Sequence, residues 1–237
     1  MERINAFLST APALILYQGD LEKARQKGTI LFYHGLGACK ESQEKEIVSL
    51  AQHGFLTVAL DNIGHGQRKY KDFEKKFSMN NPALEYDFTK AVQETAKETP
   101  DVIHALLERG LAQAGKIGIC GISMGGYIVY SALLNKCGIQ AGVSILGSPT
   151  WKIQNTESPH HFPERFFPVA FLAMNAGSDR SVPPKFAREF HERLKPFYKA
   201  SPGRLSYKEY PGADHFMPEK DWNDLWVRTL EWFDSFL

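Results

Sequence analysis

Residues 118–127 read GICGISMGGY, and this stretch decides the fold of the chain. The apolar run KIGIC at 116–120 leads into the glycines, and a segment of helical period begins at Met124. A turn this tight between a strand and a helix forces its central residue into a strained backbone conformation. Flanking glycines permit that conformation because they have no Cβ atom. The stretch therefore predicts a strand that turns sharply into a helix, with the Ser123 hydroxyl raised above the end of the strand.

Short apolar runs alternate with longer segments of helical period along the rest of the chain. We expect strands at 29–33, 55–60, 116–120, 141–146, 169–174 and 204–210, with an additional edge strand at 14–17. We expect helices at 42–53, 82–109, 124–136, 183–198 and 221–237, the second of them kinked or divided at Pro100. This alternation is typical of an α/β fold in which helices cover both faces of a mostly parallel sheet.

The organisation of the chain indicates one domain. It contains no internal repeat, low-complexity tract or linker, so residues 1–237 are expected to fold as a single unit. Two insertions interrupt the alternation of strands and helices. One, at about 67–83, is polar and charged, and the other, at about 151–168, is irregular and rich in proline, histidine and phenylalanine.

Composition excludes several classes of partner. The net charge of +1 gives no electrostatic case for nucleic acid or an anionic membrane, and no apolar run approaches the 18 residues of a membrane span. Three cysteines without a CxxC motif predict free thiols, which suits a reducing compartment. We therefore expect a soluble cytoplasmic protein without a nucleic-acid or membrane partner, whose oligomeric state the sequence leaves open.

Cofactor motifs are absent from the sequence. It contains no GxxxxGK[ST] and no GxGxxG after a strand, so we expect no nucleotide cofactor. His160 and His161 are adjacent, but no third residue lies nearby at a ligand spacing, which favours loop histidines over a metal site. We expect neither a cofactor nor a metal.

A serine hydroxyl becomes a good nucleophile only when a base takes its proton, and histidine held by a carboxylate is such a base. NAGSDRSVPP places Asp179 just beyond the strand expected at 169–174, and YPGADHF places His215 just beyond the strand expected at 204–210. Loops after the carboxyl ends of strands are where an open α/β sheet gathers its functional groups. Taken singly, Asp179 could be a turn aspartate, His215 a surface histidine and Ser123 an incidental residue of a glycine-rich turn.

These motifs together resemble the α/β-hydrolase superfamily, and the resemblance covers nearly the whole chain. In that family the order along the chain is nucleophile, acid, histidine. The resemblance therefore implies that Ser123 is the nucleophile, Asp179 the acid and His215 the base. The form GSDRSVP is itself typical of the family's acid loop. Jointly, in this order and each after a strand, the three residues favour a catalytic triad.

Acyl transfer also needs donors for a developing oxyanion. The backbone N–H of Met124 lies at a helix N-terminus, where negative charge is favoured. The family draws its second donor from an HGxG motif after an earlier strand. Here TILFYHGLG matches that motif, which implies the N–H of Leu36, with His34 as a supporting residue. HGLG could also be merely a turn before a helix.

Two other aspartates compete for the role of acid. Asp214 directly precedes His215, so its side chain should point away from the imidazole. Asp61 begins DNIGHG, which resembles the D-x-x-G-H-G turn of the family. The resemblance implies a structural role for Asp61 and for His65 in that turn.

The insertion at 151–168 lies where many members of the family carry a larger helical lid. We expect an apolar acyl pocket built from Tyr127, Trp151, Phe166 and Phe167 beside Leu36 and Met124. The resemblance is to esterases of the prolyl-oligopeptidase-like and dienelactone-hydrolase-like branch, although dienelactone hydrolase carries cysteine where this chain has serine. It implies a serine hydrolase that cleaves small carboxylic esters. Thioester or short-peptide hydrolysis, perhydrolysis and a non-catalytic binding role on the same scaffold remain alternatives.

Overall fold

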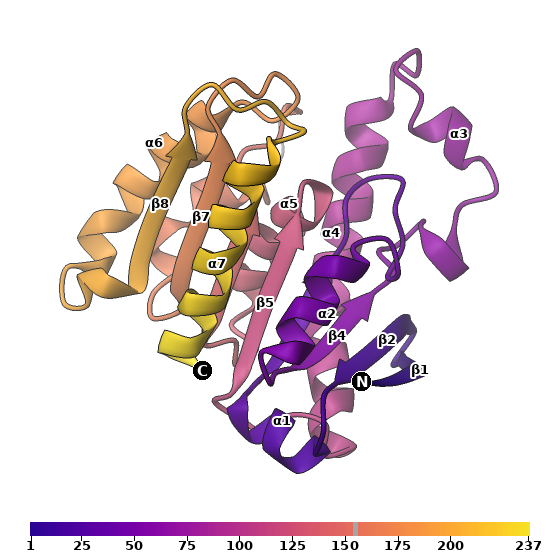
Figure 1. Cartoon of the computed structure of the whole chain (residues 1–237). Helices are drawn as coiled ribbons and strands as arrows, with labels where there is room; N and C mark the ends of the chain where they lie inside the picture. The colour runs from indigo at the N-terminus through magenta and orange to yellow at the C-terminus, as the bar shows by residue number, and fades with distance from the viewer. Residues whose placement is uncertain (154–155) are drawn as a thin grey trace.

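The centre of the molecule is a twisted sheet with the strand order β1-β2-β4-β3-β5-β6-β7-β8 (Figure 1). The computed structural model describes residues 1–153 and 156–237. The strands are β1 (Glu2–Leu8), β2 (Ala11–Tyr17), β3 (Thr29–Tyr33), β4 (Leu56–Leu60), β5 (Ile117–Ile122), β6 (Ala141–Ile145), β7 (Ala170–Ala176) and β8 (Leu205–Tyr210). β2 pairs antiparallel with β1 and β4. The six strands β3 to β8 are parallel to one another.

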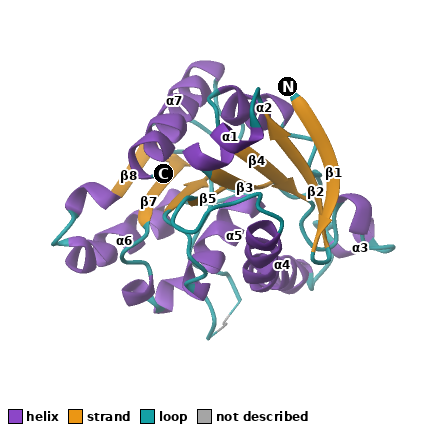
Figure 2. Cartoon of the chain, turned by 90° about the horizontal axis from the view of Figure 1, so that it is seen from below, coloured by secondary structure: helices purple, strands orange, loops and turns teal. Residues whose placement is uncertain are grey.

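Helices cover both faces of this sheet. They are α1 (Leu21–Lys27), α2 (Glu44–Gln52), α3 (Phe73–Lys76), α4 (Leu84–Glu108), α5 (Met124–Ala132), α6 (Pro184–Leu194) and α7 (Glu219–Phe236). Figure 2 shows α2 and α7 on one face and α4, α5 and α6 on the other. The predicted α/β fold with a mostly parallel sheet is therefore confirmed.

Two buried hydrophobic clusters lie on the two faces of the sheet, and successive strand residues alternate between them. In β3, Leu31 and Tyr33 belong to one cluster, whereas Ile30 and Phe32 belong to the other. Neighbouring side chains of a strand point to opposite faces, so a strand that is buried on both must be apolar throughout. This is why the central strands could be found as continuous apolar runs.

Strand β1 was not predicted. A strand was correctly expected at 14–17, but its expected position at the edge of the sheet is wrong. The strand there begins at Ala11 and is the second in the sheet, because β1 pairs along its whole length and forms the edge. β1 reads ERINAFL and is mostly exposed. A solvated edge strand does not need apolar residues on both faces, so β1 has none of the pattern that reveals the central strands.

Helix α4 runs without a break through Pro100, so of the two expected outcomes, a kink or a division, the division is wrong. A proline in a helix has no N–H for the carbonyl group four residues earlier. In α4 that carbonyl belongs to Ala96, and the side chain of Asn135 donates a 2.7 Å hydrogen bond to it. This contact from a distant part of the chain satisfies the group that the proline leaves without a partner.

The remaining elements differ from expectation mainly at their ends. The short helix α1 was missed; Asp20 caps it by accepting a hydrogen bond from the N–H of Lys23. The insertion at 67–83 contains α3, and the insertion at 151–168 contains two 3₁₀ turns, at Pro159–His161 and Pro163–Arg165. Residues 154–155 of that insertion lie outside the described part. Among the described helices, none combines the length and apolarity that crossing a bilayer requires.

Three glycines let the first turn of α5 pack closely against the ends of the neighbouring strands. A Cβ atom on Gly121 would overlap the backbone of Gly125, and one on Gly125 would overlap the carbonyl group of Tyr33 at the end of β3. A Cβ atom on Gly126 would lie 2.8 Å from the carbonyl oxygen of Ile145. Each of these neighbours is backbone, which cannot move aside as a flexible side chain could. The glycines thus fix α5 against the carboxyl ends of β3 and β6.

We expect Gly125→Ala to lower the free energy of unfolding by about 3 kcal/mol, because the new methyl group must displace the end of β3. Urea denaturation at neutral pH measures this change. Gly203→Ala is the matched control, since a Cβ atom there meets nothing within 4 Å, and it should change stability by less than about 1 kcal/mol. Equal stabilities of the two variants would contradict the close approach at Gly125.

Candidate active site

Ser123 occupies the predicted sharp turn between β5 and α5. Its φ of 55° and ψ of −114° lie in a region that residues with a side chain rarely adopt. Two backbone hydrogen bonds hold it there. Ser123 N–H donates to Ile145 O at 2.8 Å, and Tyr127 N–H donates to Ser123 O at 3.2 Å. The strain is therefore sustained by contacts on both sides of the turn.

The structure brings Ser123, His215 and Asp179 into one hydrogen-bonded chain. Ser123 Oγ lies 3.1 Å from His215 Nε2, and His215 Nδ1 lies 2.6 Å from Asp179 Oδ2. A carboxylate oxygen only accepts, so Nδ1 carries the proton and Nε2 presents its lone pair to the serine. This arrangement can remove the serine proton. The three residues follow the carboxyl ends of β5, β7 and β8, and these ends lie at the same edge of the sheet.

Asp179 is fixed by its own loop. The residue is 4% exposed, and its Oδ1 accepts hydrogen bonds from the N–H groups of Ser181 and Val182 at 2.8 and 2.9 Å. These two bonds leave Oδ2 aimed at the imidazole. The loop after β7 is joined to the loop after β8 by a bond from Ser178 N–H to Ala213 O. Acid and histidine are therefore positioned as one unit.

The competing aspartates make other contacts. Asp214 Oδ1 accepts a hydrogen bond from the backbone N–H of His215, at 2.7 Å, rather than from the imidazole. Asp61 is fully buried and accepts from the N–H groups of Lys40 and Gln67 at 2.8 and 2.9 Å. These bonds tie the loop after β3 to the turn after β4, the structural task expected for Asp61.

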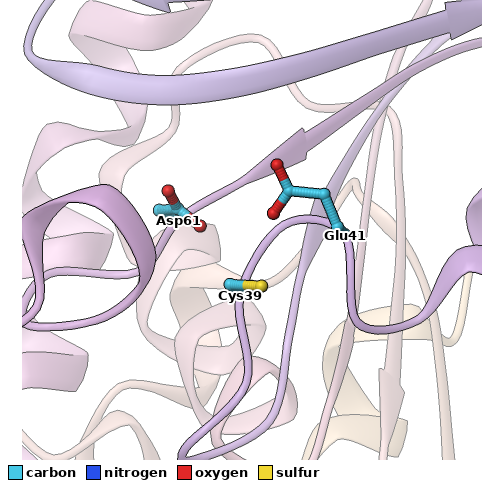
Figure 3. A group of neighbouring side chains, drawn as sticks. All are labelled: Cys39, Glu41 and Asp61. Carbon is cyan, nitrogen blue, oxygen red and sulfur yellow. The ribbon is translucent and has the colours of Figure 1, made fainter.

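A possible metal-binding group lies beside this turn (Figure 3). One ligand atom each from Cys39, Glu41 and Asp61 lies within 4.8 Å of the other two. The ammonium group of Lys40 is 2.8 Å from the Glu41 carboxylate and 3.3 Å from that of Asp61. It already supplies the positive charge that these carboxylates require. The arrangement is an ion-pair cluster that holds the loop after β3.

The two expected oxyanion donors, the N–H groups of Met124 and Leu36, belong to residues beside Ser123 in the chain and on the wall around it. The N–H of Met124 is the first of α5, where the helix provides no partner. Within the described residues, nothing accepts a hydrogen bond from the N–H of Leu36, which lies in the loop after β3. That loop passes close to the serine, since a Cβ atom on Gly35 would lie 3.7 Å from Ser123 Cβ. In the part of the chain that the structure describes, both N–H groups are therefore without an acceptor, and the loop that carries one of them passes the serine.

His34 supports the loop from behind. It is 1% exposed, its Nδ1 lies 2.7 Å from Gly35 O, and its Nε2 accepts a hydrogen bond from Asn62 N–H at 3.0 Å. The neighbouring groups thus require a neutral imidazole with its proton on Nδ1. Burial lowers the pKa of His34 from 6.5 to about 4, which keeps it neutral. His65 is equally buried and packs beside it, with ring centroids 5.3 Å apart.

A cavity of about 840 Å³ opens above Ser123 and His215. Most of its wall is apolar, and three exposed hydrophobic side chains stand on it: Leu36, Met79 and Phe216. The charged residues of the wall are Glu85, Lys152 and Arg180. The other residues that line it are Gly35, Ala38, Gln43, Leu84, Phe88, Ile122, Tyr127, Leu146, Ser181, Val182, Met217 and Trp222.

The predicted pocket residues fare unequally. Tyr127 lines the cavity, but Trp151, Phe166 and Phe167 do not, so that part of the prediction is wrong. Phe166 is fully buried in the core, where its ring packs against those of Tyr130, Phe171 and Phe190. Phe167 packs on Tyr198. Trp151 is buried, with 6% of its surface exposed, and lines a different cavity.

Sequence reasoning missed the residues that replace them. Phe216 and Met217 follow His215 directly, so their place in the chain could have indicated them. Leu84 and Phe88 are four residues apart and share one face of α4. The sequence offered no sign that the start of α4 would lie over the site, because that depends on the packing of α4 against α5.

The fold and this site together define a hydrolase of the α/β type with a serine at the nucleophile turn. A family model described as serine aminopeptidase, S33, matches residues 24–168, and the chain belongs to this family. A Bacillus subtilis (strain 168) protein named "Putative esterase YitV" is 26% identical over 262 residues, which cover 98% of each chain.

Two solved structures are similar throughout. TT1662 from Thermus thermophilus has a TM-score of 0.81 at 19% identity, with 98% of each chain covered. A Klebsiella pneumoniae protein named "Putative Dienelactone Hydrolase" has a TM-score of 0.72 at 18% identity, with 99% of this chain and 98% of that chain covered. At these identities the likeness concerns the fold alone, whereas the matching family model confirms the resemblance drawn from the motifs.

We expect the free energy of unfolding to fall as the pH drops from 6.5 towards 4, because the unfolded chain takes up a proton on His34 near pH 6.5 and the native chain only near pH 4. The contribution of the neutral imidazole is complete above pH 6.5 and is lost across this window, at up to about 1.4 kcal/mol per pH unit. His34→Gln keeps an acceptor for Asn62 N–H but does not titrate, so its stability should fall less steeply. Urea denaturation at pH 7, 6 and 5 measures both slopes.

His104→Gln is the control for this series, because the His104 side chain is 72% exposed on α4. Its slope should equal that of the unmodified chain. Some slope will persist in His34→Gln, since burial also lowers the pKa of His191 to about 4. Identical slopes for His34→Gln and the unmodified chain would show that His34 is not the buried neutral group described above.

Proposed function

We propose that this protein hydrolyses small carboxylic esters through an acyl-enzyme formed on Ser123. The observation that carries the proposal is the hydrogen-bonded chain of Ser123, His215 and Asp179, which meets a large apolar cavity beside two available N–H groups. A nucleophile with an oriented base and oxyanion donors is the equipment of acyl transfer. None of the steps requires a cofactor.

In the first half-reaction, His215 Nε2 takes the proton of Ser123 as Oγ attacks the ester carbonyl carbon. Asp179 holds the imidazole through Nδ1 and stabilises the imidazolium. The N–H groups of Leu36 and Met124 bind the oxyanion of the tetrahedral intermediate. His215 then gives the proton to the leaving alkoxide, and the alcohol departs. In the second half-reaction, His215 deprotonates a water that attacks the acyl group, and the acid is released as Oγ regains its proton.

The wall of the cavity favours esters over aminopeptides. An aminopeptidase must hold the ammonium group of its substrate, and a free carboxylate is the usual means. Glu85 is the one described carboxylate on the wall, and it is engaged by Lys152 Nζ at 2.6 Å. The apolar rim of Leu36, Met79 and Phe216 suits an uncharged acyl or alcohol chain instead.

Thioesterase, short-peptide hydrolase and perhydrolase activities would use the same three residues, and a binding protein would use only the cavity. The ester assignment agrees with the name of the Bacillus relative. A cytoplasmic location belongs to the same proposal. It is supported by the three free cysteines, Cys39, Cys120 and Cys137.

We expect p-nitrophenyl esters of two to eight carbons to be turned over faster than matched acyl thioesters and aminoacyl p-nitroanilides. Ser123→Ala should lower kcat on the best ester by at least about a thousandfold while keeping the unfolding midpoint. A fluorophosphonate probe should label the unmodified chain at Ser123 and leave Ser123→Ala unlabelled. Faster turnover of the thioesters or anilides would replace the ester assignment, and failure of the probe to label Ser123 would favour a binding protein.

Asp179→Asn should lower kcat by about a hundredfold or more, because an amide N–H facing Nδ1 favours the tautomer whose protonated Nε2 cannot accept the serine proton. Asp214→Asn is the control. Its oxygen still accepts the N–H of His215, and turnover should stay within about twofold. Steady-state kinetics on one ester compare these variants with Asp61→Asn. Retained turnover in Asp179→Asn together with its loss in correctly folded Asp61→Asn would move the role of the acid to Asp61.

A further inference from the structure

One charged side chain on the wall of the cavity above Ser123, that of Arg180, has no ion-pair or hydrogen-bond partner among residues 1–153 and 156–237. Arg180 lines the cavity and is exposed, and among the described residues no carboxylate forms an ion pair with it. Arg180 keeps all five of its N–H donors for solvent or for a bound molecule.

The backbone that carries Arg180 is held in place. The residue lies between Asp179, whose carboxylate binds His215, and Ser181, whose N–H donates to Asp179 Oδ1. The base of the arginine side chain is therefore fixed relative to the reacting serine and histidine. A guanidinium group so placed can meet a charged group of a molecule that is bound at Ser123.

The neighbouring charges do not cancel it. Glu85 and Lys152 lie 2.6 Å apart and neutralise one another. The oxygens of Asp179 are occupied, Oδ1 by two backbone N–H groups and Oδ2 by His215 Nδ1. Among the described residues, the wall consequently presents one uncompensated positive charge beside a largely apolar surface, at an exposed position where water and salt moderate its attraction for an anion.

We propose that Arg180 is a specificity-determining residue that selects esters carrying a carboxylate on their acyl or alcohol part over neutral and cationic esters. This inference rests on the proposed esterase function and names its substrate class. A guanidinium binds a carboxylate through two parallel N–H···O bonds, a geometry that a neutral chain end cannot offer. A quaternary ammonium group would be repelled by the same charge.

The test compares esters of equal chain length. Mono-4-nitrophenyl glutarate ends in a carboxylate, 4-nitrophenyl pentanoate ends in a methyl group, and the 4-nitrophenyl ester of 4-(trimethylammonio)butanoic acid ends in a cation. 4-Acetoxybenzoate and 4-tolyl acetate form the matching pair for the alcohol part. A preference within the first set locates the anion on the acyl part, and a preference within the second locates it on the alcohol part.

In the unmodified chain we expect kcat/KM for one of the two carboxylate esters to exceed that of its neutral partner by about fivefold, the upper range for an exposed ion pair. The ratio should fall to about one in Arg180→Gln and persist within about twofold in Arg180→Lys. The change should lie in KM rather than kcat, and 0.5 M NaCl should reduce the ratio by screening. Arg188→Gln, which removes an arginine of α6 paired with Glu209, should leave the ratio unchanged.

Ratios that are the same in Arg180→Gln and in the unmodified chain would overturn the proposal, as would a preference for the cationic ester. Failure of every ester, the neutral ones included, would instead count against the esterase function. In that event the dissociation constant of mono-4-nitrophenyl glutarate for Ser123→Ala, compared with Ser123→Ala/Arg180→Gln, still tests Arg180. Equal constants would overturn the role of Arg180, and weaker binding by the double variant would support it.

Discussion

The site depends on how closely the first turn of α5 approaches the end of β3. Gly125 lies directly against the carbonyl group of Tyr33, with no space for a Cβ atom. Because β3 and β5 are neighbours in the sheet, this approach brings the loop after β3 beside Ser123, where Gly35 lies in contact with the serine. Leu36 follows Gly35 in that loop and lines the same cavity as Ser123. A longer separation would leave the serine with the N–H of Met124 but without the loop that carries the second expected donor.

The strain of Ser123 follows from the same packing. A non-glycine residue with φ near 55° and ψ near −114° costs of order 1–3 kcal/mol. It persists because β6 binds its N–H and α5 binds its carbonyl, so that relaxing the turn would break two hydrogen bonds and move a helix. The functional groups opposite it are fixed in a similar way: Asp179 by two backbone N–H groups, and His34 by the neutral tautomer that Gly35 and Asn62 require. The geometry is therefore built into the fold before any substrate arrives.

Local pattern was enough to predict the parts of the molecule that local chemistry determines. The central strands are apolar on both faces, and the turn at Ser123 needs glycines at fixed positions, so both are visible in a single sequence. β1 was invisible because an edge strand in water needs no such pattern. The continuity of α4 past Pro100 depends on Asn135, a residue 35 positions further along the chain, and no local pattern contains that information. The pocket was mistaken for a similar reason, because Phe166 is as apolar as a pocket residue but is buried in the core between α5 and α6.

Different parts of this structure determine the class of reaction and the choice of substrate. Proteins named as dienelactone hydrolases and as peptidases share this fold, so the fold alone does not decide which bond is broken. Substrate choice must be inferred from the other groups that line the cavity. Here these are an apolar rim, the mutually neutralising ion pair of Glu85 and Lys152, and the guanidinium of Arg180, which has no ion-pair partner among the described residues. A substrate that bears an ammonium group would find no free carboxylate on the described wall. The positive charge of Arg180 would repel it. The electrostatics of the cavity thus argue against an aminopeptidase, although the family model carries that description.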